Sequence, residues 1–469
     1  MTDFATDVVV LGAGPAGENV ADHATRHGLD VIIVERELVG GECSYWACMP
    51  SKALLVPPAV AARANRVPGA VSARAEVDVA TVLDRRDGFA SHWDDGAQVG
   101  WLEGVGVRLL RGEGRLSGPR RVRVVAGDGD AHDVEARVAV VVATGSTPVP
   151  PPIDGLDEID TWSSRDATTA STVPRRLAVV GGGAVGVEMA QAWARLGATA
   201  TLIEARERLL PDEEPFVGDE LAAAFRAEGI EVLVDTAVEG VASRDDGIAV
   251  RVGGRTIDVD ELLVATGRRP ALEGIGLESI DLDAAEVDTD AERRVVGVDG
   301  GWLYMIGDAA GEVLLTHQGK YEARRIGEAI ARGNAPDLRA TELGPPRAVF
   351  TDPQVAAVGR TTAQARDAGV ELATATVELS SVAGGALRED DIRGRVHFVV
   401  DADRDVLVGA TFVGPGVAEM LHAATIAVVG EVPLDRLRHA VPAFPTMSEV
   451  WFSLLEELDG VSGRPPRTG

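Results

Sequence analysis

Apolar residues form short continuous runs that end in glycine-rich turns and are followed by residues with helical periodicity. Residues 7–36, DVVVLGAGPAGENVADHATRHGLDVIIVER, contain such a run, a turn, a helical stretch and a second apolar run, VIIVE. Residues 175–205, RRLAVVGGGAVGVEMAQAWARLGATATLIEA, repeat this order. Uninterrupted apolar runs are typical of strands that are buried on both faces of a parallel sheet. The pattern therefore predicts an α/β fold that contains two strand–turn–helix–strand units.

Each unit carries the residues that a dinucleotide site needs. The turn glycines are Gly12, Gly14 and Gly17 in the first unit and Gly181, Gly183 and Gly186 in the second. Glycines at this spacing let the backbone approach a pyrophosphate at the helix N-terminus, and an acid at the end of the second strand accepts a ribose hydroxyl group. Glu35 and Glu204 stand at these two strand ends. Two complete copies predict two bound dinucleotides, one flavin and one nicotinamide.

The remaining apolar runs divide the chain further. Short runs at 138–155, 261–270 and 302–311 also end in glycine turns. After about Pro345, apolar and polar residues alternate and the chain then becomes helix-rich, without a dinucleotide signature. A chain of 469 residues is long enough for two to four domains. We expect parts at 1–152 and 153–272 that carry the first and the second dinucleotide unit, a further central part at 273–344, and an oligomerisation or substrate domain at 345–469.

Composition and charge narrow the range of partners. Hydrophobic residues make up 45% of the chain, but no run of about 18 apolar residues occurs, so we expect no membrane span. The chain begins directly with a strand-like run instead of a secretory signal, which favours a cytoplasmic location. The formal net charge is −29, which argues against binding to nucleic acid or to an anionic membrane.

Residues 40–52, GGECSYWACMPSK, hold both cysteines of the chain, Cys43 and Cys48, and Lys52, one of two lysines among 45 basic residues. These cysteines can form a disulfide if the backbone turns sharply between them, as at a helix start, which Pro50 favours. A thiol at a helix start beside an ammonium gains thiolate character. A static disulfide and a zinc site are alternatives, but zinc normally needs four ligands and the sequence offers no second Cys pair, so no metal is expected. Beside two dinucleotides, a redox-active pair is the preferred interpretation.

Together these motifs resemble those of the flavoprotein pyridine nucleotide–disulfide oxidoreductases, the family of dihydrolipoamide dehydrogenase, glutathione reductase and mercuric reductase. The resemblance covers essentially the whole chain and rests on GAGPAG, GGECSYWACMPSK, ATGS, GGGAVGVE, ATGRRP, YMIGD and FTDPQVAAVG. It implies two Rossmann-like domains for FAD and NAD(P), a C-terminal α+β dimerisation domain and a homodimer. The implied reaction passes electrons from NADH through FAD to the Cys43–Cys48 disulfide and on to a small-molecule acceptor.

The resemblance also implies roles for individual residues. Cys48 would be the thiolate beside the flavin and Cys43 the thiol that attacks the substrate. Lys52 would approach flavin N5 and pair with Glu188. The implied FAD-binding residues are Gly12, Gly14, Gly17, Glu35, Lys52, Gly114, Thr144, Gly145 and Asp308. The implied residues for the nicotinamide cofactor are Gly181, Gly183, Gly186, Glu188, Glu204 and Gly267.

Two acidic residues leave alternatives open. Glu204 favours NADH because a carboxylate repels the 2′-phosphate of NADPH, although Arg206 and Arg208 nearby could admit NADPH. Glu42 precedes Cys43 where similar proteins carry Thr. Its carboxylate could raise the pKa of the Cys43 thiol, accept a proton, or point to solvent.

The sequence departs from the family at the expected general base. In the family a His-Pro-Thr-x-x-Glu stretch of the partner subunit supplies this base, but residues 444–449 read FPTMSE here. Phe444 cannot carry a proton, whereas the acid, Glu449, is retained. The acceptor could be a disulfide-type substrate with a good leaving group or its own acid, a quinone reduced directly by the flavin, or a metal ion, as in mercuric reductase. A flavin-bearing redox sensor with little turnover is the alternative to an enzyme.

Overall fold

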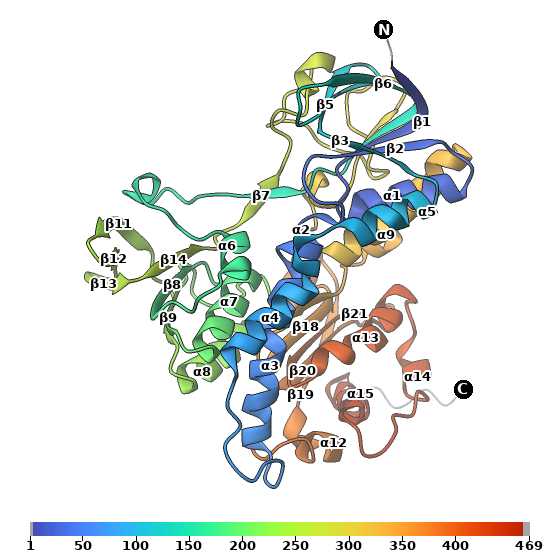
Figure 1. Cartoon of the computed structure of the whole chain (residues 1–469). Helices are drawn as coiled ribbons and strands as arrows, with labels where there is room; N and C mark the ends of the chain where they lie inside the picture. The colour runs from blue at the N-terminus through green and yellow to red at the C-terminus, as the bar shows by residue number, and fades with distance from the viewer. Residues whose placement is uncertain (1–2, 463–469) are drawn as a thin grey trace. The chain divides into compact units, whose positions relative to one another are not determined.

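The computed structural model describes residues 3–462, which fall into two compact units (Figure 1). The first unit comprises the residues up to Pro50, Asp84–Val149 and Gly267–Leu338. The second comprises Ser51–Leu83, Pro150–Thr266 and the residues from Arg339 onward. Within residues 3–462, no helix combines the length and the apolar character needed to cross a membrane.

A mixed sheet of seven strands forms the centre of the first unit. Its order is β3 (Arg108–Arg111), β2 (Val31–Glu35), β1 (Phe4–Leu11), β6 (Ala131–Val142), β5 (Arg121–Val125) and β4 (Glu113–Gly118), with β16 (Leu303–Met305) also paired to β6. Strands β3, β2, β1, β6 and β16 pair in parallel, whereas β5 is antiparallel to both β4 and β6. A short ribbon pairs β7 (Ser146–Pro148) with β15 (Arg268–Pro270).

Alternate residues of the parallel strands enter two different cores. The helices of this unit are α1 (Pro15–Arg26), α2 (Gly41–Tyr45), α5 (Gly96–Gly104) and α9 (Thr316–Arg332), while α3 (Cys48–Arg66) and α4 (Val79–Phe89) cross the division between the units. Val8 and Val10 of β1 belong to a core shared with α1, α5 and α9, which lie along one face of the sheet (Figure 1). Val9 and Leu11 belong to the core on the other face, with residues of β4 and β5. Burial on both faces explains why the run is apolar throughout.

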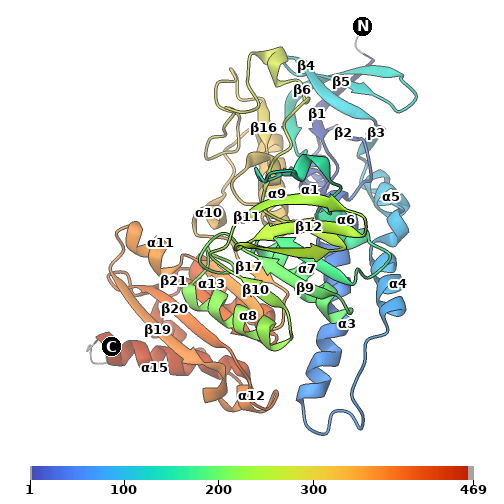
Figure 2. The same cartoon turned by 90° about the vertical axis from the view of Figure 1, so that its left-hand side faces the viewer.

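The second unit contains the repeat of the strand–turn–helix–strand pattern. Its parallel sheet has the order β10 (Glu231–Leu233), β9 (Thr199–Ile203), β8 (Arg176–Val180) and β14 (Glu261–Val264), with helices α6 (Ser164–Thr169), α7 (Ala184–Arg195) and α8 (Pro215–Ala227) in the same stretch of chain. An antiparallel sheet of β11 (Val238–Arg244), β12 (Gly247–Val252) and β13 (Arg255–Val259) is inserted before β14 (Figure 2). Both predicted strand–turn–helix–strand repeats, β1–α1–β2 and β8–α7–β9, are thus present.

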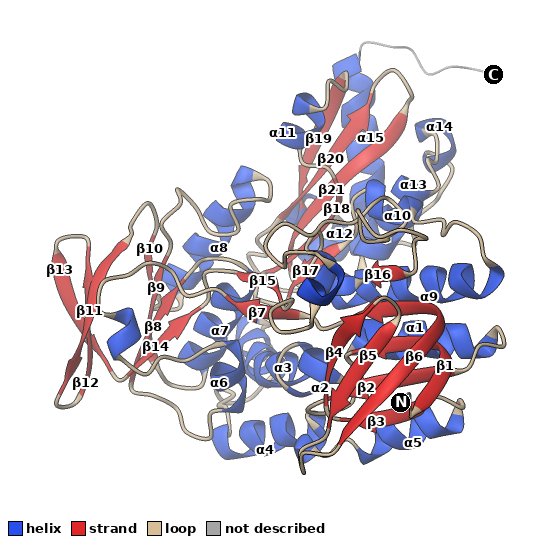
Figure 3. Cartoon of the chain, turned by 90° about the horizontal axis from the view of Figure 1, so that it is seen from above, coloured by secondary structure: helices blue, strands red, loops and turns tan. Residues whose placement is uncertain are grey.

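The C-terminal part of the second unit is an antiparallel sheet packed against helices. Its strand order is β17 (Arg347–Val349), β18 (Gln354–Gly359), β21 (Val406–Gly414), β20 (Arg395–Asp401) and β19 (Leu372–Glu378). The helices are α10 (Arg339–Glu342), α11 (Thr362–Asp367), α12 (Ala383–Ala386), α13 (Leu421–Val429), α14 (Leu434–Leu437) and α15 (Val450–Ser462). Phe398 and Phe412 of the sheet share a core with Ala424 of α13 and Leu454 of α15, which both lie on one side of the strands in Figure 3.

Candidate active site

The two glycine turns have nearly the same geometry. The first glycine of each turn has a positive φ, +96° at Gly12 and +108° at Gly181, which other residues rarely adopt. A Cβ at Gly17 would lie 1.9 Å from the backbone oxygen of Gly12, and one at Gly186 would lie 1.8 Å from that of Gly181. A Cβ at Gly183 would meet nothing within 4 Å, so protein packing does not demand this glycine. The turns therefore fit the backbone approach that a pyrophosphate needs.

An acid closes each turn onto the end of its neighbouring strand. The two carboxylate oxygens of Glu35 accept backbone N–H groups, from Ala13 at 2.7 Å and from the residue two positions further on at 2.8 Å. Glu204 repeats this arrangement with Gly182 at 2.6 Å and with the residue two positions on at 2.7 Å. These bonds hold each carboxylate beside its glycine turn, where a ribose hydroxyl group is expected.

The other residues expected to bind FAD differ in their hydrogen bonding and in the space around them. The hydroxyl oxygen of Thr144 is buried and has no hydrogen-bond partner within residues 3–462, as expected for a group that awaits a ligand. Gly145, with φ +77°, has open space where a Cβ would stand. A Cβ at Gly114 would lie 2.8 Å from Leu11 and 2.9 Å from Val34, so packing against the sheet alone accounts for this glycine.

Asp308 ends a chain of polar contacts that begins beside the cysteines. Ser146 donates a hydrogen bond to Asp308 at 2.6 Å, and Arg268 donates to the Ser146 hydroxyl at 2.8 Å. Arg268 also lies 3.6 Å from the Glu42 carboxylate, so Glu42 faces a cation as well as solvent. Burial raises the pKa of Asp308, against the hydrogen bond from Ser146 and the charge of Arg268. Gly267, next to Arg268, has φ +145° and open space at its Cβ position.

The loop that carries the cysteines packs against the first glycine turn. Gly40 and Gly41, which stand at the start of α2, both have positive φ, +111° and +58°. A Cβ at Gly41 would lie 2.7 Å from the Cα of Gly14, so a larger residue would separate the loop from the turn. Tyr45 is fully buried at the end of α2, and its hydroxyl group donates to the backbone oxygen of Val39 at 2.9 Å. Tyr45 therefore serves the packing of this loop.

Cys43 and Cys48 are adjacent half-buried thiols. Cys43 lies in α2, and Cys48 is the first residue of α3, so the expected helix start is confirmed. The two thiols share a hydrogen bond, and the sulfur of Cys48 lies 3.3 Å from the Thr316 hydroxyl oxygen. The pKa of Cys43 is raised by the bond to Cys48, by burial and by the negative charge of Cys48, while Thr316 and Lys320 act in the opposite direction. The arrangement favours one thiolate and one thiol over two thiolates.

Lys52 and Glu188 form the ion pair that the resemblance implies. The Lys52 ammonium lies 2.8 Å from Oε2 of Glu188, although the two residues are 136 positions apart. The other carboxylate oxygen accepts the backbone N–H of Phe350 at 2.9 Å. The ammonium also lies 5.1 Å from the centre of the Phe350 ring, within the range of a cation–π contact.

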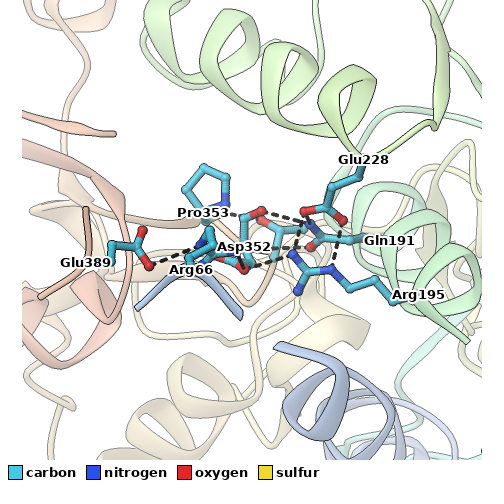
Figure 4. A network of polar contacts seen from close by, with 8 residues as sticks. Arg66, Gln191, Arg195, Glu228, Asp352, Pro353 and Glu389 are labelled. Atoms are coloured by element: carbon cyan, nitrogen blue, oxygen red, sulfur yellow. Dashed lines mark hydrogen bonds and ion pairs between the residues drawn. The ribbon is translucent and has the colours of Figure 1, made fainter. Parts of the chain in front are cut away.

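Farther along the same face of α7, Gln191 and Arg195 contact Asp352 (Figure 4). Gln191 and the Asp352 backbone exchange two hydrogen bonds of 2.8 Å. The Asp352 carboxylate pairs with Arg195 at 2.8 Å and Arg66 at 2.9 Å, and Arg66 also contacts Glu389 at 3.1 Å. Burial alone would raise the pKa of Asp352, but the two arginines outweigh it and lower this pKa. The network, which sequence reasoning missed, fixes α7 against the segment of Asp352, which also carries the Phe350 N–H that contacts Glu188.

Phe444 and Glu449 lie on the segment before α15 in the second unit. The Phe444 side chain is 77% exposed, so it does not pack into a hydrophobic core of the described residues. Glu449 accepts the backbone N–H of Gly384 at 3.1 Å. A Cβ at Gly384 would lie 2.0 Å from the carbonyl carbon of Thr446, so this glycine lets the segment close on α12. The Gly384 N–H thus holds the Glu449 carboxylate in place.

Comparison with known proteins places these features in one family. Residues 6–333 match the family described as pyridine nucleotide-disulphide oxidoreductase, and residues 345–454 match the dimerisation domain of that family. The dihydrolipoyl dehydrogenase of Chlorobaculum tepidum is 33% identical, across 94% of this chain and 95% of the relative. That of Thermus scotoductus is 34% identical, across 96% and 97%. The mercuric reductase of Acidithiobacillus ferrooxidans is 32% identical, across 94% of this chain and 80% of the relative.

Solved structures share the fold. LpdA of Mycobacterium tuberculosis superposes with a TM-score of 0.85 at 24% identity, across 97% of this chain and 99% of that one. The flavoprotein disulfide reductase RclA of Escherichia coli gives 0.84 at 22% identity, with the same coverage. The predicted α/β class, with FAD-binding, NAD-binding and dimerisation domains, is therefore confirmed. The chain belongs to the pyridine nucleotide-disulphide oxidoreductases and is an FAD-dependent enzyme that uses NAD(H).

Proposed function

We propose that this enzyme passes two electrons from NADH to a redox-active Cys43–Cys48 disulfide and from there to a small-molecule acceptor. The observation that carries the proposal is the hydrogen bond between the two thiols, because only adjacent sulfurs can form and break a disulfide in each turnover. Thr316 hydrogen-bonds to both thiols, and Cys48 is the first residue of α3, where the helix dipole supports it as the thiolate. Cys43 then serves as the thiol that attacks the acceptor. FAD, when bound, supplies the two-electron relay between nicotinamide and disulfide.

The chain offers residues that fit both cofactors. For FAD we propose Gly12, Gly14, Gly17, Glu35, Lys52, Thr144, Gly145 and Asp308, with Gly114 in support because it lets β4 approach the sheet. For the nicotinamide cofactor we propose Gly181, Gly183, Gly186, Glu188, Glu204 and Gly267. The role of Lys52 is to present a compact positive charge to the flavin ring, which a planar guanidinium would do less well. Glu188 positions that charge.

NADH is the preferred cofactor because Glu204 presents a carboxylate at its ribose site. Its oxygens are fixed by two backbone N–H groups, so it is held where it would repel a 2′-phosphate. The two arginines that could attract such a phosphate are already paired with acids. Arg206 lies 2.9 Å from Asp212, and Arg208 lies 3.1 Å from Glu207.

The acceptor is a disulfide-type substrate that does not depend on an imidazole of this enzyme. Phe444 stands at the expected position of the base and is 77% exposed, so it offers an apolar surface in place of a proton. That surface would also suit a flat apolar molecule, which supports a quinone as the second candidate. A metal ion is a weaker candidate, because the whole chain has two cysteines and no further pair to capture one. A redox sensor is disfavoured by the retained Lys52–Glu188 pair.

The enzyme is proposed to be a homodimer with the domain bounds expected from the sequence. The dimerisation domain at residues 345–454 supports an assembly in which Phe444 and Glu449 face Cys43 of the partner subunit. The bounds 1–152, 153–272, 273–344 and 345–469 stay predictions, as does a cytoplasmic location. Sedimentation of the holoenzyme tests the dimer, and limited proteolysis tests the bounds.

Alkylation of the thiols tests the relay. The holoenzyme as purified is expected to protect Cys43 and Cys48 from iodoacetamide, whereas one equivalent of NADH under anaerobic conditions should expose Cys43 to labelling. Peptide mass spectrometry reports which cysteine is labelled. If NADH reduces the flavin but leaves both cysteines unlabelled, the proposed relay is wrong and direct transfer from flavin to a quinone becomes the better account.

A further inference from the structure

Glu18 and Lys320 lie on two helices that meet the cysteine loop. Glu18 stands one helical turn after Gly14, the residue that contacts Gly41 at the start of α2. Lys320 stands one helical turn after Thr316, whose hydroxyl group contacts Cys48. Residues four positions apart share a face of a helix. Glu18 and Lys320 are therefore on the helix faces that contact the cysteine loop. Lys320 is also the second of the two lysines in this arginine-rich chain.

Helices α1 and α9 pack against each other on either side of Lys320. A Cβ at Gly319 would lie 3.5 Å from the Cβ of Ala16, in the first turn of α1. One turn further on, the Arg324 side chain donates to Asn19, the residue next to Glu18, at 3.0 Å. Lys320 lies between these two contacts along α9. Its ammonium charge acts on both Glu18 and Cys43 and favours the ionised form of each.

Glu18 is a partly buried acid, and one of its carboxylate oxygens is fully buried. Its Oε1 atom is buried and has no hydrogen-bond partner within residues 3–462. Burial raises the pKa of Glu18 to about 7, Lys320 works against this rise, and the charge of Glu35 adds to it. Tyr45 is the third ionisable group that interacts with Glu18, but its hydroxyl group donates to Val39 and burial raises its own pKa to about 12. Lys320 and Glu35 are therefore the charges that set the protonation of Glu18.

We propose that Glu18, acting across the Lys320 ammonium, is the acid–base partner of the Cys43–Cys48 pair, in place of the imidazole that Phe444 does not supply. The proposal rests on the disulfide relay proposed above. One ammonium can stabilise the thiolate of Cys43 or the carboxylate of Glu18, but the two anions repel each other. Loss of a proton from Cys43 is therefore coupled to uptake of a proton by Glu18.

The proposed proton movements balance over one turnover with a disulfide acceptor. NADH supplies two electrons and one proton; the S–S bond breaks, Cys48 becomes a thiolate and Cys43 a thiol, and the Cys43 proton passes to the Glu18 carboxylate as Cys43 ionises for attack. The Cys43 thiolate then attacks one sulfur of the acceptor, and the first leaving thiolate receives the proton from Glu18. Cys48 attacks Cys43 to restore the enzyme disulfide, and the second leaving thiolate takes a proton from solvent.

The pH dependence of Cys43 alkylation in the NADH-reduced holoenzyme tests this proposal. With iodoacetamide as the probe, the wild-type rate is expected to show an inflection near pH 7 besides the ionisation of the thiol itself. Lys320→Met should slow Cys43 alkylation at pH 7 by about 10-fold, as for one unit of thiol pKa. Glu18→Gln should abolish the inflection and speed alkylation at pH 8 by about 3-fold or more. Lys320→Arg keeps the charge and should stay within about 3-fold of the wild type.

The rate of Cys43 alkylation should fall in Lys320→Met and rise in Glu18→Gln. These opposite changes separate an electrostatic role from a structural one, because damage to the helix packing would change both rates in the same direction. Arg324→Met is the matched control, since it removes a cation of α9 that contacts α1 beside Glu18, and it should leave the profile unchanged. Changes of the same sign in Glu18→Gln and Lys320→Met would overturn the proposal. So would a wild-type profile with a single thiol ionisation, a result that needs no variant. If NADH fails to expose Cys43 in the wild type, the relay itself is refuted.

Discussion

The Lys52 ammonium lies 2.8 Å from one oxygen of Glu188, while the backbone N–H of Phe350 holds the other oxygen at 2.9 Å. The Glu188 side chain is only 6% exposed, compared with 31% for Lys52, so the acid is the buried anchor of the pair. A carboxylate bound on both sides has one orientation, and the ammonium that pairs with it is fixed as well. Glu188 therefore positions Lys52.

Removing Glu188 tests this anchoring. Glu188→Ala leaves a buried N–H and an ammonium without their partner and should lower the free energy of unfolding by about 2–3 kcal/mol. Glu188→Gln keeps an acceptor for Phe350 and should cost about 1 kcal/mol. Urea unfolding of both variants measures the difference. Equal losses would show that the carboxylate does not anchor the lysine.

Asp352 should contribute strongly to stability through its two arginines. Asp352→Asn leaves Arg66 and Arg195 with one acid fewer in a largely buried network and should cost about 3 kcal/mol at pH 7. Because folding lowers the pKa of Asp352, the charge contributes fully above its unfolded value near 3.8 and is lost as the pH falls through the lower folded value. The difference in the free energy of unfolding between the wild type and Asp352→Asn should thus become smaller below about pH 4.

Asp212→Asn is the control for that comparison, because it breaks an ion pair with Arg206 whose side chains are 63% and 85% exposed. Such a pair should contribute less than about 1 kcal/mol. Urea titrations at several pH values compare the two variants. A loss in Asp352→Asn no larger than in this control would contradict the stabilising role of the network.

The dinucleotide turns could be predicted from the sequence because they are local. Gly12, Gly17 and Glu35 lie within one unit, and spacing alone predicts their arrangement. The pairing of Lys52 with Glu188 was implied only by the family resemblance, because a contact across 136 positions leaves no periodic signal in the sequence. Their family roles, as opposed to their contact, stay predictions.

Two other features of the site lay beyond the sequence. Asp352 looks like any other acid until the fold brings it to α7, and the contact between Cys48 and Thr316 joins segments that are 268 positions apart. Lys320 did carry a signal, its rarity, but rarity cannot say which groups the ammonium faces. Charge pairing in space depends on how helices pack, and that packing is specified by apolar residues elsewhere in the chain.

Glu204 should determine the choice of nicotinamide cofactor. The wild type is expected to favour NADH over NADPH in kcat/KM by about 10-fold or more, since about 1.4 kcal/mol of differential binding suffices. Glu204→Ala should lower kcat/KM for NADH by about 10-fold without a comparable loss for NADPH. Steady-state kinetics with each cofactor measure both values. A wild-type preference for NADPH would refute the assignment.

Restoring an imidazole at position 444 should reveal the specificity of the acceptor site. Phe444→His is expected to raise turnover of lipoamide by about 10²-fold, because a positioned acid–base group typically contributes at least this much. Quinone reduction should not gain, since it needs no thiol exchange. Phe444→Leu controls for the loss of the aromatic ring. No gain with lipoamide would mean that Phe444 does not occupy the place of the base.

The most direct test of the disulfide relay is an anaerobic titration of the holoenzyme with NADH, followed by absorbance. In the wild type, the first two electrons should reside on Cys43 and Cys48, so the flavin stays oxidised and a long-wavelength band from the adjacent thiolate appears. In Cys43→Ser the same two electrons should bleach the flavin at once. Bleaching of the flavin by the first equivalent in both proteins, with no long-wavelength band in the wild type, would contradict the relay.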